Sequence, residues 1–565
     1  MFRTSKLLLT ALLVLSLEAC EETTTNILGA NLAFKGGNIY TANDVSPNVE
    51  MVVVDDGRIV CAGVVSSCEG YVGGQTTIID LKGNSMYPGF TDAHGHLGGI
   101  GFRELSLNME GTPSIAAMME RLAERVDKTP EGSTIIGRGW IETHWPEERF
   151  PTRYDLDAVS PNNPVLLRRA DGHALVANSK AMEEVGISSE TDTPFGGDIL
   201  KDENGAPTGM FIDLAMGLMS SLYEKPSLSE RKNAFKVAGE VYSAYGWTGI
   251  HSMGETLEDI KLQEDLSQKS ELGLRVYNSV GGNTPDAMKL IEQGGQSSQN
   301  GEVVTRSIKL YMDGALGSRG AALLEPYSDA DTTGLLMATQ EQYRPLHEGA
   351  LRAGIQINTH AIGDRGNREL LNWYEDVFNS VPKSEWAIKK PRWRDEHTQI
   401  VNMEDISRFK SLGVIPSMQP SHAIGDLFFA PDRLGKERLH GAYAWRTLID
   451  SGVIIAGGTD APVERGDPRI EFYGAVARKS IDGFSNQDWH PEEAVTRTEA
   501  LKMFTLWPAY ASFMENDLGS IEVGKLADFT IFSENIMMIP HDEILKVKTV
   551  MTVVGGNVVY RVDGF

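Results

Sequence analysis

Two histidines one residue apart, His94 and His96, are the first side chains along the chain whose spacing could hold a metal ion. They end the segment Pro88–His96, whose Pro-Gly start disfavours a helix. Residues two apart on a strand point to the same face, whereas ligand pairs on a helix are three or four residues apart. The segment therefore predicts a strand that carries a metal site. Asp92 has the same parity and is a candidate to orient one of the imidazoles.

A metal centre needs further ligands, and other predicted strands also end in residues that can hold or bridge a metal. Any one of these residues, taken alone, is more often an ordinary buried side chain. If the strands form one parallel barrel, however, their C-terminal ends meet at one rim, where such barrels place their catalytic groups. The candidate ligands beyond the first pair are Lys309, His360, His397 and Asp460.

The elements that must position these residues alternate along the middle of the chain. Short apolar, β-branched segments are separated by helices with start signals, such as Ser227 with Glu230 three residues later, and Thr284 followed by Pro285. This alternation is typical of a parallel sheet with crossover helices, and eight strands predict an α/β fold of the (β/α)8 TIM-barrel type over 89–514. After the opening strand with His94, the predicted strands are 248–254, 274–280, 307–313, 355–361, 395–401, 414–419 and 453–460.

Two departures from a plain barrel are visible. The distance between the first two strands is too long for one helix and loop, which predicts an inserted lid subdomain at about 129–223 above the catalytic rim. Both chain ends, 30–88 and 515–565, consist of short β-rich runs broken by Gly and Asn turns. We expect them to build one small composite β-sandwich.

The first residues predict export. A basic start is followed by an apolar run, 7–17, that is much shorter than the ~20 residues a membrane-spanning helix needs, and this is typical of a signal peptide. The ending Leu17-Glu18-Ala19-Cys20 resembles the bacterial lipobox, so we expect a signal peptide over 1–20, a lipid on Cys20 and a polar tether over 21–29. The protein would then be a lipoprotein of the bacterial cell envelope, anchored to the membrane on the periplasmic side. The alternative is plain export with cleavage near Ala19.

Charge and cysteine content narrow the partners. A net charge of −26 and a pI near 4.9 leave no basic face for nucleic acid, so we expect a small-molecule substrate. A homo-oligomer is compatible with the sequence. Cys61 and Cys68 are an even pair in an oxidising compartment, where they are either a short-loop disulfide or two buried thiols.

The chain resembles the amidohydrolase superfamily, in the branch that includes N-substituted formamide deformylases (amidohydrolase family 3). The resemblance covers nearly the whole mature chain and is more specific for the superfamily than for a substrate. The matching motifs are 88–96, Asp313-Gly314-Ala315-Leu316-Gly317-Ser318-Arg319, 359–364, Glu396-His397, 458–463 and 518–528.

The resemblance implies a centre with two divalent metal ions, zinc being the expected metal. His94, His96 and Asp460 would hold one ion, His360 and His397 the other, and carbamylated Lys309 would bridge them. A buried lysine with a depressed pKa can supply the neutral amine that captures carbon dioxide, whereas an ordinary ammonium would be repelled by the ions. A bridging hydroxide would then attack a carbonyl carbon, with Asp460 moving the proton as the catalytic residue.

These residues predict a hydrolase acting on carbon-nitrogen bonds other than peptide bonds, in an amide or N-acyl compound. Hydrolysis of an ester, lactone or phosphoester, and a non-catalytic binding or regulatory lipoprotein on this scaffold, are the alternatives. His173, Arg319 and His422 are candidates for substrate binding; each could equally be structural, Arg319 by stabilising its own loop.

Overall fold

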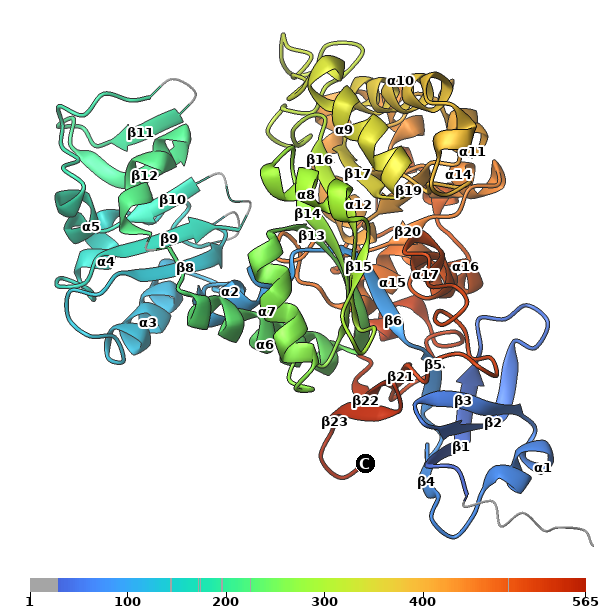
Figure 1. Ribbon diagram of the computed structural model, residues 1–565. Helices are drawn as coiled ribbons and strands as arrows, with labels where there is room; N and C mark the ends of the chain where they lie inside the picture. The colour runs from blue at the N-terminus through green and yellow to red at the C-terminus, as the bar shows by residue number, and fades with distance from the viewer. Residues whose placement is uncertain are drawn as a thin grey trace, which may run out of the picture.

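The computed structural model contains three sheets, and the barrel lies between the other two (Figure 1). The structure describes residues 29–142, 145–170, 172, 174–194, 197–223, 225–485 and 487–565. The signal peptide, Cys20 and most of the tether therefore lie outside the described residues. Within the described part of the chain, no helix is long and apolar enough to span a membrane.

Eight parallel strands form the barrel, in the same order in space as in the sequence. All eight predicted strands are present, which confirms the predicted fold class. The last is only two residues long, but the backbone N–H groups of Thr459 and Asp460 donate to the carbonyl of His94 and so join it to the first. The strands are β6 (Phe90–Gly95), β13 (Trp247–Glu255), β14 (Arg275–Gly281), β16 (Val303–Tyr311), β17 (Gln356–Ala361), β18 (Arg394–His397), β19 (Ile415–Met418) and β20 (Ala456–Gly457).

Helices connect these strands, and the predicted start signals are observed. Ser227 and Glu230 form a capping box at the start of α6, and the Thr284 hydroxyl caps α8, which has Pro285 in its first turn. The main connecting helices are α2 (Leu97–Leu105), α6 (Leu228–Tyr245), α7 (Leu257–Ser267), α8 (Pro285–Gln293), α9 (Gln340–Ala353), α10 (Asp364–Ser380), α11 (Ile406–Leu412), α12 (Pro420–Asp426), α13 (Ala430–Leu434), α14 (Trp445–Asp450), α15 (Pro468–Ala477), α16 (Arg497–Met503) and α17 (Leu506–Ala511).

Strands from both chain ends share one further sheet, below the barrel in Figure 1. The junction is antiparallel pairing of β5 (Ser85–Pro88) with β21 (Phe529–Phe532), and β1 (Leu32–Tyr40) pairs with three neighbours, so the sheet branches. Cys61 and Cys68 form a disulfide. The other strands are β2 (Asn48–Asp55), β3 (Arg58–Gly63), β4 (Thr77–Asp80), β22 (Thr549–Val554) and β23 (Asn557–Arg561), and the short helices are α1 (Val65–Cys68) and α18 (His541–Ile544).

The inserted subdomain has its own sheet and core, beside the barrel in Figure 1. It begins earlier than the expected residue 129, because the first strand of its sheet and the helix that follows pack into the same core. Its elements are β7 (Leu107–Asn108), α3 (Ile115–Val126), β8 (Ile135–Trp140), α4 (Arg153–Asp157), β9 (Val165–Arg169), β10 (Ala174–Ala177), α5 (Ser179–Glu184), β11 (Gly197–Lys201), β12 (Pro207–Asp213) and the 3₁₀ segment Leu214–Leu222.

Candidate metal centre

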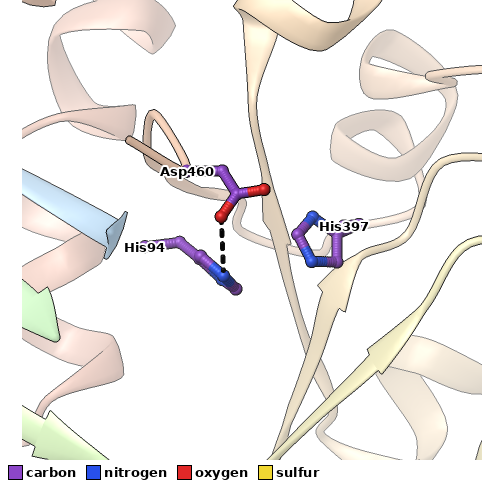
Figure 2. Close-up of side chains that lie close together, drawn as sticks. All are labelled: His94, His397 and Asp460. Atoms are coloured by element: carbon purple, nitrogen blue, oxygen red, sulfur yellow. Dashed lines mark ion pairs between the residues drawn. The ribbon is translucent and has the colours of Figure 1, made fainter. Parts of the chain in front are cut away.

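Three of the predicted ligands, His94, His397 and Asp460, bring ligand atoms within 4.8 Å of one another. Figure 2 shows these side chains meeting from three different segments of the barrel. His94 Nε2 lies 3.5 Å from Asp460 Oδ1, and the rings of His94 and His397 have centroids 4.7 Å apart. The centre therefore assembles from β6, the end of β18 and the segment after β20, at the rim expected for a barrel enzyme.

His96 adds a fourth ligand-type side chain to this group. Its Nε2 lies 3.1 Å from Asp460 Oδ1, while its Nδ1 hydrogen-bonds the Met253 carbonyl at 2.9 Å. A carbonyl only accepts, so Nδ1 carries the proton, and in the neutral ring Nε2 keeps a lone pair. His96 Nε2 and Asp460 Oδ1 then face each other, each with a lone pair, at hydrogen-bond distance. A proton or a cation between these two atoms would stabilise the arrangement.

Glu396 orients His94, a role that was not expected. Its Oε2 accepts a 2.5 Å hydrogen bond from His94 Nδ1, which directs Nε2 toward the centre. Arg394 forms an ion pair with the other oxygen at 2.7 Å, and both side chains are fully buried. Burial alone would raise the pKa of Glu396, but Arg394 and His94 outweigh it and hold that pKa well below its usual range. The carboxylate is therefore ionised at any physiological pH.

His397 is held in the same manner. Its Nδ1 is 2.9 Å from Gln419 Oε1, which can only accept, so its Nε2 also keeps a lone pair. Both His397 and Asp460 have positive φ, 80° and 59°, a conformation that is rare for residues with side chains. Gly458 allows the segment before Asp460 to lie close to the backbone of β6, since a Cβ at position 458 would lie 2.5 Å from the backbone nitrogen of His94. The surrounding packing therefore maintains a strained backbone at two ligand positions.

Asp92 does not orient an imidazole, contrary to the expectation. Its carboxylate accepts hydrogen bonds from Tyr242 and from the backbone and side chain of Thr459, and from the His94 backbone N–H. It therefore fastens the segment that carries Asp460 against the strand that carries His94. The prediction was wrong because parity gives only the face of the strand, and the nearest donors on that face belong to a segment more than 360 residues away.

Lys309 is buried in the centre, with Nζ 3.3 Å from His94 Nε2. Burial lowers the pKa of Lys309 to about 8. A substantial fraction of the side chain is therefore the neutral amine at mildly alkaline pH, which is the form that reacts with carbon dioxide.

His360 lies at the edge of the group. Its ring centroid is 4.5 Å from that of His397, but its buried Nε2 has no hydrogen-bond partner among the described residues and lies 3.8 Å from Asp313 Oδ1. Asp313 accepts backbone N–H groups from Ala322, Ile362 and Gly363, so it ties the loop after β16 to the end of β17. The first residue of the 313–319 motif thus has a positioning role beside His360.

The donor set fits divalent cations such as zinc. Burial lowers the pKa of His94 to about 4 and of His360 to about 3, and that of His397 falls well below its usual range, so all three are neutral at pH 7. Neutral imidazoles with one carboxylate are typical zinc ligands, and metals bind the deprotonated forms. A bound cation would give Nε2 of His360 a partner. It would also remove the repulsion between the lone pairs of His96 Nε2 and Asp460 Oδ1.

His422 faces the centre from the opposite side of Asp460. Its Nε2 lies 3.5 Å from Asp460 Oδ2 and 3.9 Å from Glu464 Oε1, and its Nδ1 is 3.0 Å from the side-chain nitrogen of Gln399. An amide nitrogen only donates, so the His422 proton is on Nε2. His422 therefore presents its Nε2–H toward the carboxylate of Asp460, without a hydrogen bond to a described residue.

Arg319, the other candidate for substrate binding that lies within the described residues, is not part of this group. Arg319 forms a two-pronged ion pair with Asp329 at 2.8 and 3.0 Å, within the loop that follows β16. His173 lies outside the described residues. His251, on β13, accepts a hydrogen bond from Arg394 at 2.8 Å and also lies outside this group.

Comparisons with known proteins agree with this arrangement. A family model described as "Amidohydrolase family" matches residues 77–560. YtcJ of Bacillus subtilis is 33% identical over 93% of this chain and 98% of its own, and the N-substituted formamide deformylase of Arthrobacter pascens is 27% identical over 94% and 99%. An uncharacterized metal-dependent hydrolase of Pyrococcus horikoshii has a TM-score of 0.74 at 26% identity, covering 90% of this chain and 99% of that one. The chain belongs to the amidohydrolase family.

Proposed function

We propose that the protein is a metal-dependent hydrolase that cleaves the carbon-nitrogen bond of a small, non-peptide amide or N-acyl compound. The observation that carries the proposal is the group of imidazoles around Asp460. Hydrogen bonds from Nδ1 of His94, His96 and His397 to Glu396, Met253 and Gln419 leave Nε2 of each ring available to a metal ion. The relative named N-substituted formamide deformylase supports this bond type.

The ligands would be His94, His96 and Asp460 for one ion, His360 and His397 for the other, with carbamylated Lys309 between them. Bound divalent ions would polarise the substrate carbonyl and acidify a water molecule. The buried, ionised pair of Arg394 and Glu396 keeps His94 in the required orientation and adds no net charge.

Asp460 is suited to proton transfer because its two oxygens have different surroundings. Oδ1 faces His94 and His96, whereas Oδ2 lies toward His422. We infer that Asp460 takes the proton of the attacking water and delivers it to the departing nitrogen, a step that an amide needs more than an ester because an amide anion is too basic to leave unassisted. The Nε2–H of His422 can donate to the substrate oxygen or hold Asp460 Oδ2.

The experiment compares amides with matched esters and phosphoesters by kcat/KM, using purified protein loaded with zinc. Hydrolysis of N-formyl or N-acetyl amines that is lost on removal of the metal supports the proposal. Turnover of esters, lactones or phosphoesters with no amide cleaved across a broad panel would overturn it. Absence of any turnover by metal-loaded protein would favour a binding or regulatory role.

The site of action is a second part of the proposal. We propose export and a lipid anchor on Cys20, on the strength of the basic start, the short apolar run and the Leu17–Cys20 ending. The disulfide between Cys61 and Cys68 supports an oxidising compartment.

A further inference from the structure

Two arginines lie side by side on the sheet of the inserted subdomain. Arg138 of β8 and Arg168 of β9 are register partners in parallel strands, so their side chains share one face of the sheet. Arg138 Nη2 donates a long hydrogen bond, 3.5 Å, to the Ala170 carbonyl. Among the described residues, no carboxylate oxygen lies within 4.0 Å of either guanidinium.

This pair is unfavourable as it stands. Like charges on adjacent strands repel one another. Arg138 is half-buried, and burial together with Arg103 and Arg168 lowers its pKa. A negatively charged group between the two guanidiniums would remove the repulsion and accept stronger hydrogen bonds than the long one that Arg138 donates to Ala170.

Arg138 lines a cavity of about 490 Å³ that the inserted subdomain and the barrel form together. The barrel side includes Ser421, which precedes His422, and Glu464, whose Oε1 lies 3.9 Å from His422 Nε2. The cavity therefore extends from the rim of the metal centre to Arg138, and it is large enough for a small ligand.

Most of the other charged groups of this cavity are already paired or uncharged, and the remaining one, Asp482, is exposed and forms no ion pair with Arg138. Arg465 is paired with Glu110 at 2.6 Å, and Arg103 donates to two backbone carbonyls and to Glu104. Burial, with its acidic neighbours, raises the pKa of Glu464 to about 8, so it is largely uncharged at pH 7. Arg138 is thus the lining cation that is available to a ligand.

We propose that Arg138, with Arg168 beside it, binds a carboxylate of the substrate, so that the preferred substrates are acyl amines with a free carboxylate, such as N-acyl amino acids. This inference rests on the proposed function and specifies its substrate class. A guanidinium offers two parallel N–H donors that match a planar carboxylate. The acyl group would lie at the metal centre while the carboxylate lies at the lid.

The test pairs each N-formyl or N-acetyl amino acid with its carboxamide, which differs only in the negative charge. We expect the wild-type enzyme to prefer the acid, and Arg138→Gln to raise KM for the acid by at least ~10-fold while kcat changes little, because the lost contact is a charge-assisted hydrogen bond far from the reacting atoms. KM for the carboxamide should change by less than ~2-fold. Arg138→Lys should recover part of the effect. Lys128→Gln, which removes an exposed positive charge from the same subdomain, is the matched control.

Binding of the same acids and carboxamides to wild-type protein, measured by calorimetry, separates this inference from the proposed function. Equal affinity for acid and carboxamide, or equal loss of both in Arg138→Gln, overturns the carboxylate site even if amides are hydrolysed. Tighter binding of acids that depends on Arg138 supports the site even if the bond cleaved is not an amide. Preference for a phosphate-bearing analogue over the carboxylate would also overturn it.

Discussion

Replacing Glu396 with glutamine would test whether this buried carboxylate orients His94 and neutralises Arg394. Glutamine keeps the size and can still accept the hydrogen bond from His94 Nδ1, but it leaves the guanidinium uncompensated in a site where both side chains are fully buried. Removing one partner of a buried pair costs ~3–5 kcal/mol, and we expect the lower end because the hydrogen bond survives. For a unit of roughly 300 residues the unfolding entropy is ~0.6 kcal/mol/K, so ~3 kcal/mol lowers Tm by ~5 °C.

The second expected effect of Glu396→Gln is weaker metal binding, by ~10–100-fold, which is the usual cost of losing a partner that orients a ligand. Thermal unfolding of the metal-free protein, followed by circular dichroism, measures the first effect. Zinc titration against a chelator measures the second. Glu404→Gln is the control, because Glu404 pairs with Arg368 at 3.3 Å with its side chain 83% exposed. A surface pair of this kind contributes ~0–1 kcal/mol, and it is remote from the ligands.

The difference in stability between the wild type and Glu396→Gln should decrease at low pH. The pKa of Glu396 is held well below its usual range by Arg394 and His94, against the effect of burial. The contribution of the Glu396 carboxylate to the free energy of unfolding is therefore fully present above ~4.3, the pKa of glutamate in the unfolded chain. It is lost as the pH falls toward the pKa of Glu396 in the folded protein. The Tm difference between wild type and Glu396→Gln should be constant from about pH 5 to 8 and should narrow below about pH 4. Unchanged zinc affinity beside a lowered Tm would refute the orienting role.

Three other predictions concern the centre and the N-terminus. Lys309→Ala should lose activity and one metal ion per chain, with partial rescue by short carboxylic acids that occupy the bridging position; full metal content by atomic absorption would show that the bridge lies elsewhere. Asp460→Asn should keep the fold and most of the metal but lose at least ~10²-fold in kcat, since it removes the proton-transfer group, and a kcat within a few-fold of wild type would leave Asp460 as a ligand only. The mature N-terminal peptide should begin at a lipid-modified Cys20 by mass spectrometry, and an unmodified Cys20 or a different first residue would contradict the anchor.

The barrel strands, and the rim at which the candidate ligands gather, could be predicted because their signals are local. A β-branched run followed by His, Lys or Asp marks the end of a strand wherever it occurs, and parallel strands bring such ends to one rim. The His94–His96 spacing predicted a strand, and β6 contains or adjoins both residues. The capping box at Ser227 is likewise complete within four residues.

The contacts that hold the ligands could not be predicted in this way, because they join residues far apart in the sequence. Glu396 and His94 are 302 residues apart, and the sequence around Glu396 contains no feature from which its hydrogen-bond partner could be predicted. Asp92 was assigned the wrong partner for the same reason. An arginine such as Arg319 can bind an anionic substrate group, but the guanidinium of Arg319 is already paired with Asp329, ten residues away.

The presence or absence of a carboxylate partner distinguishes the arginines of this protein from one another. A guanidinium with a carboxylate partner, such as Arg394 with Glu396 or Arg319 with Asp329, has its charge balanced within the protein. Arg138 is half-buried beside a second arginine and faces a cavity, and its acidic neighbour Glu110 is paired with Arg465, so the remaining balancing charge comes from a ligand or from solvent. A substrate carboxylate bound to Arg138 would exclude that solvent, and the amide nitrogen of the same substrate would lie toward Asp460. Substrate selection at the lid would then be linked to proton transfer at the barrel rim.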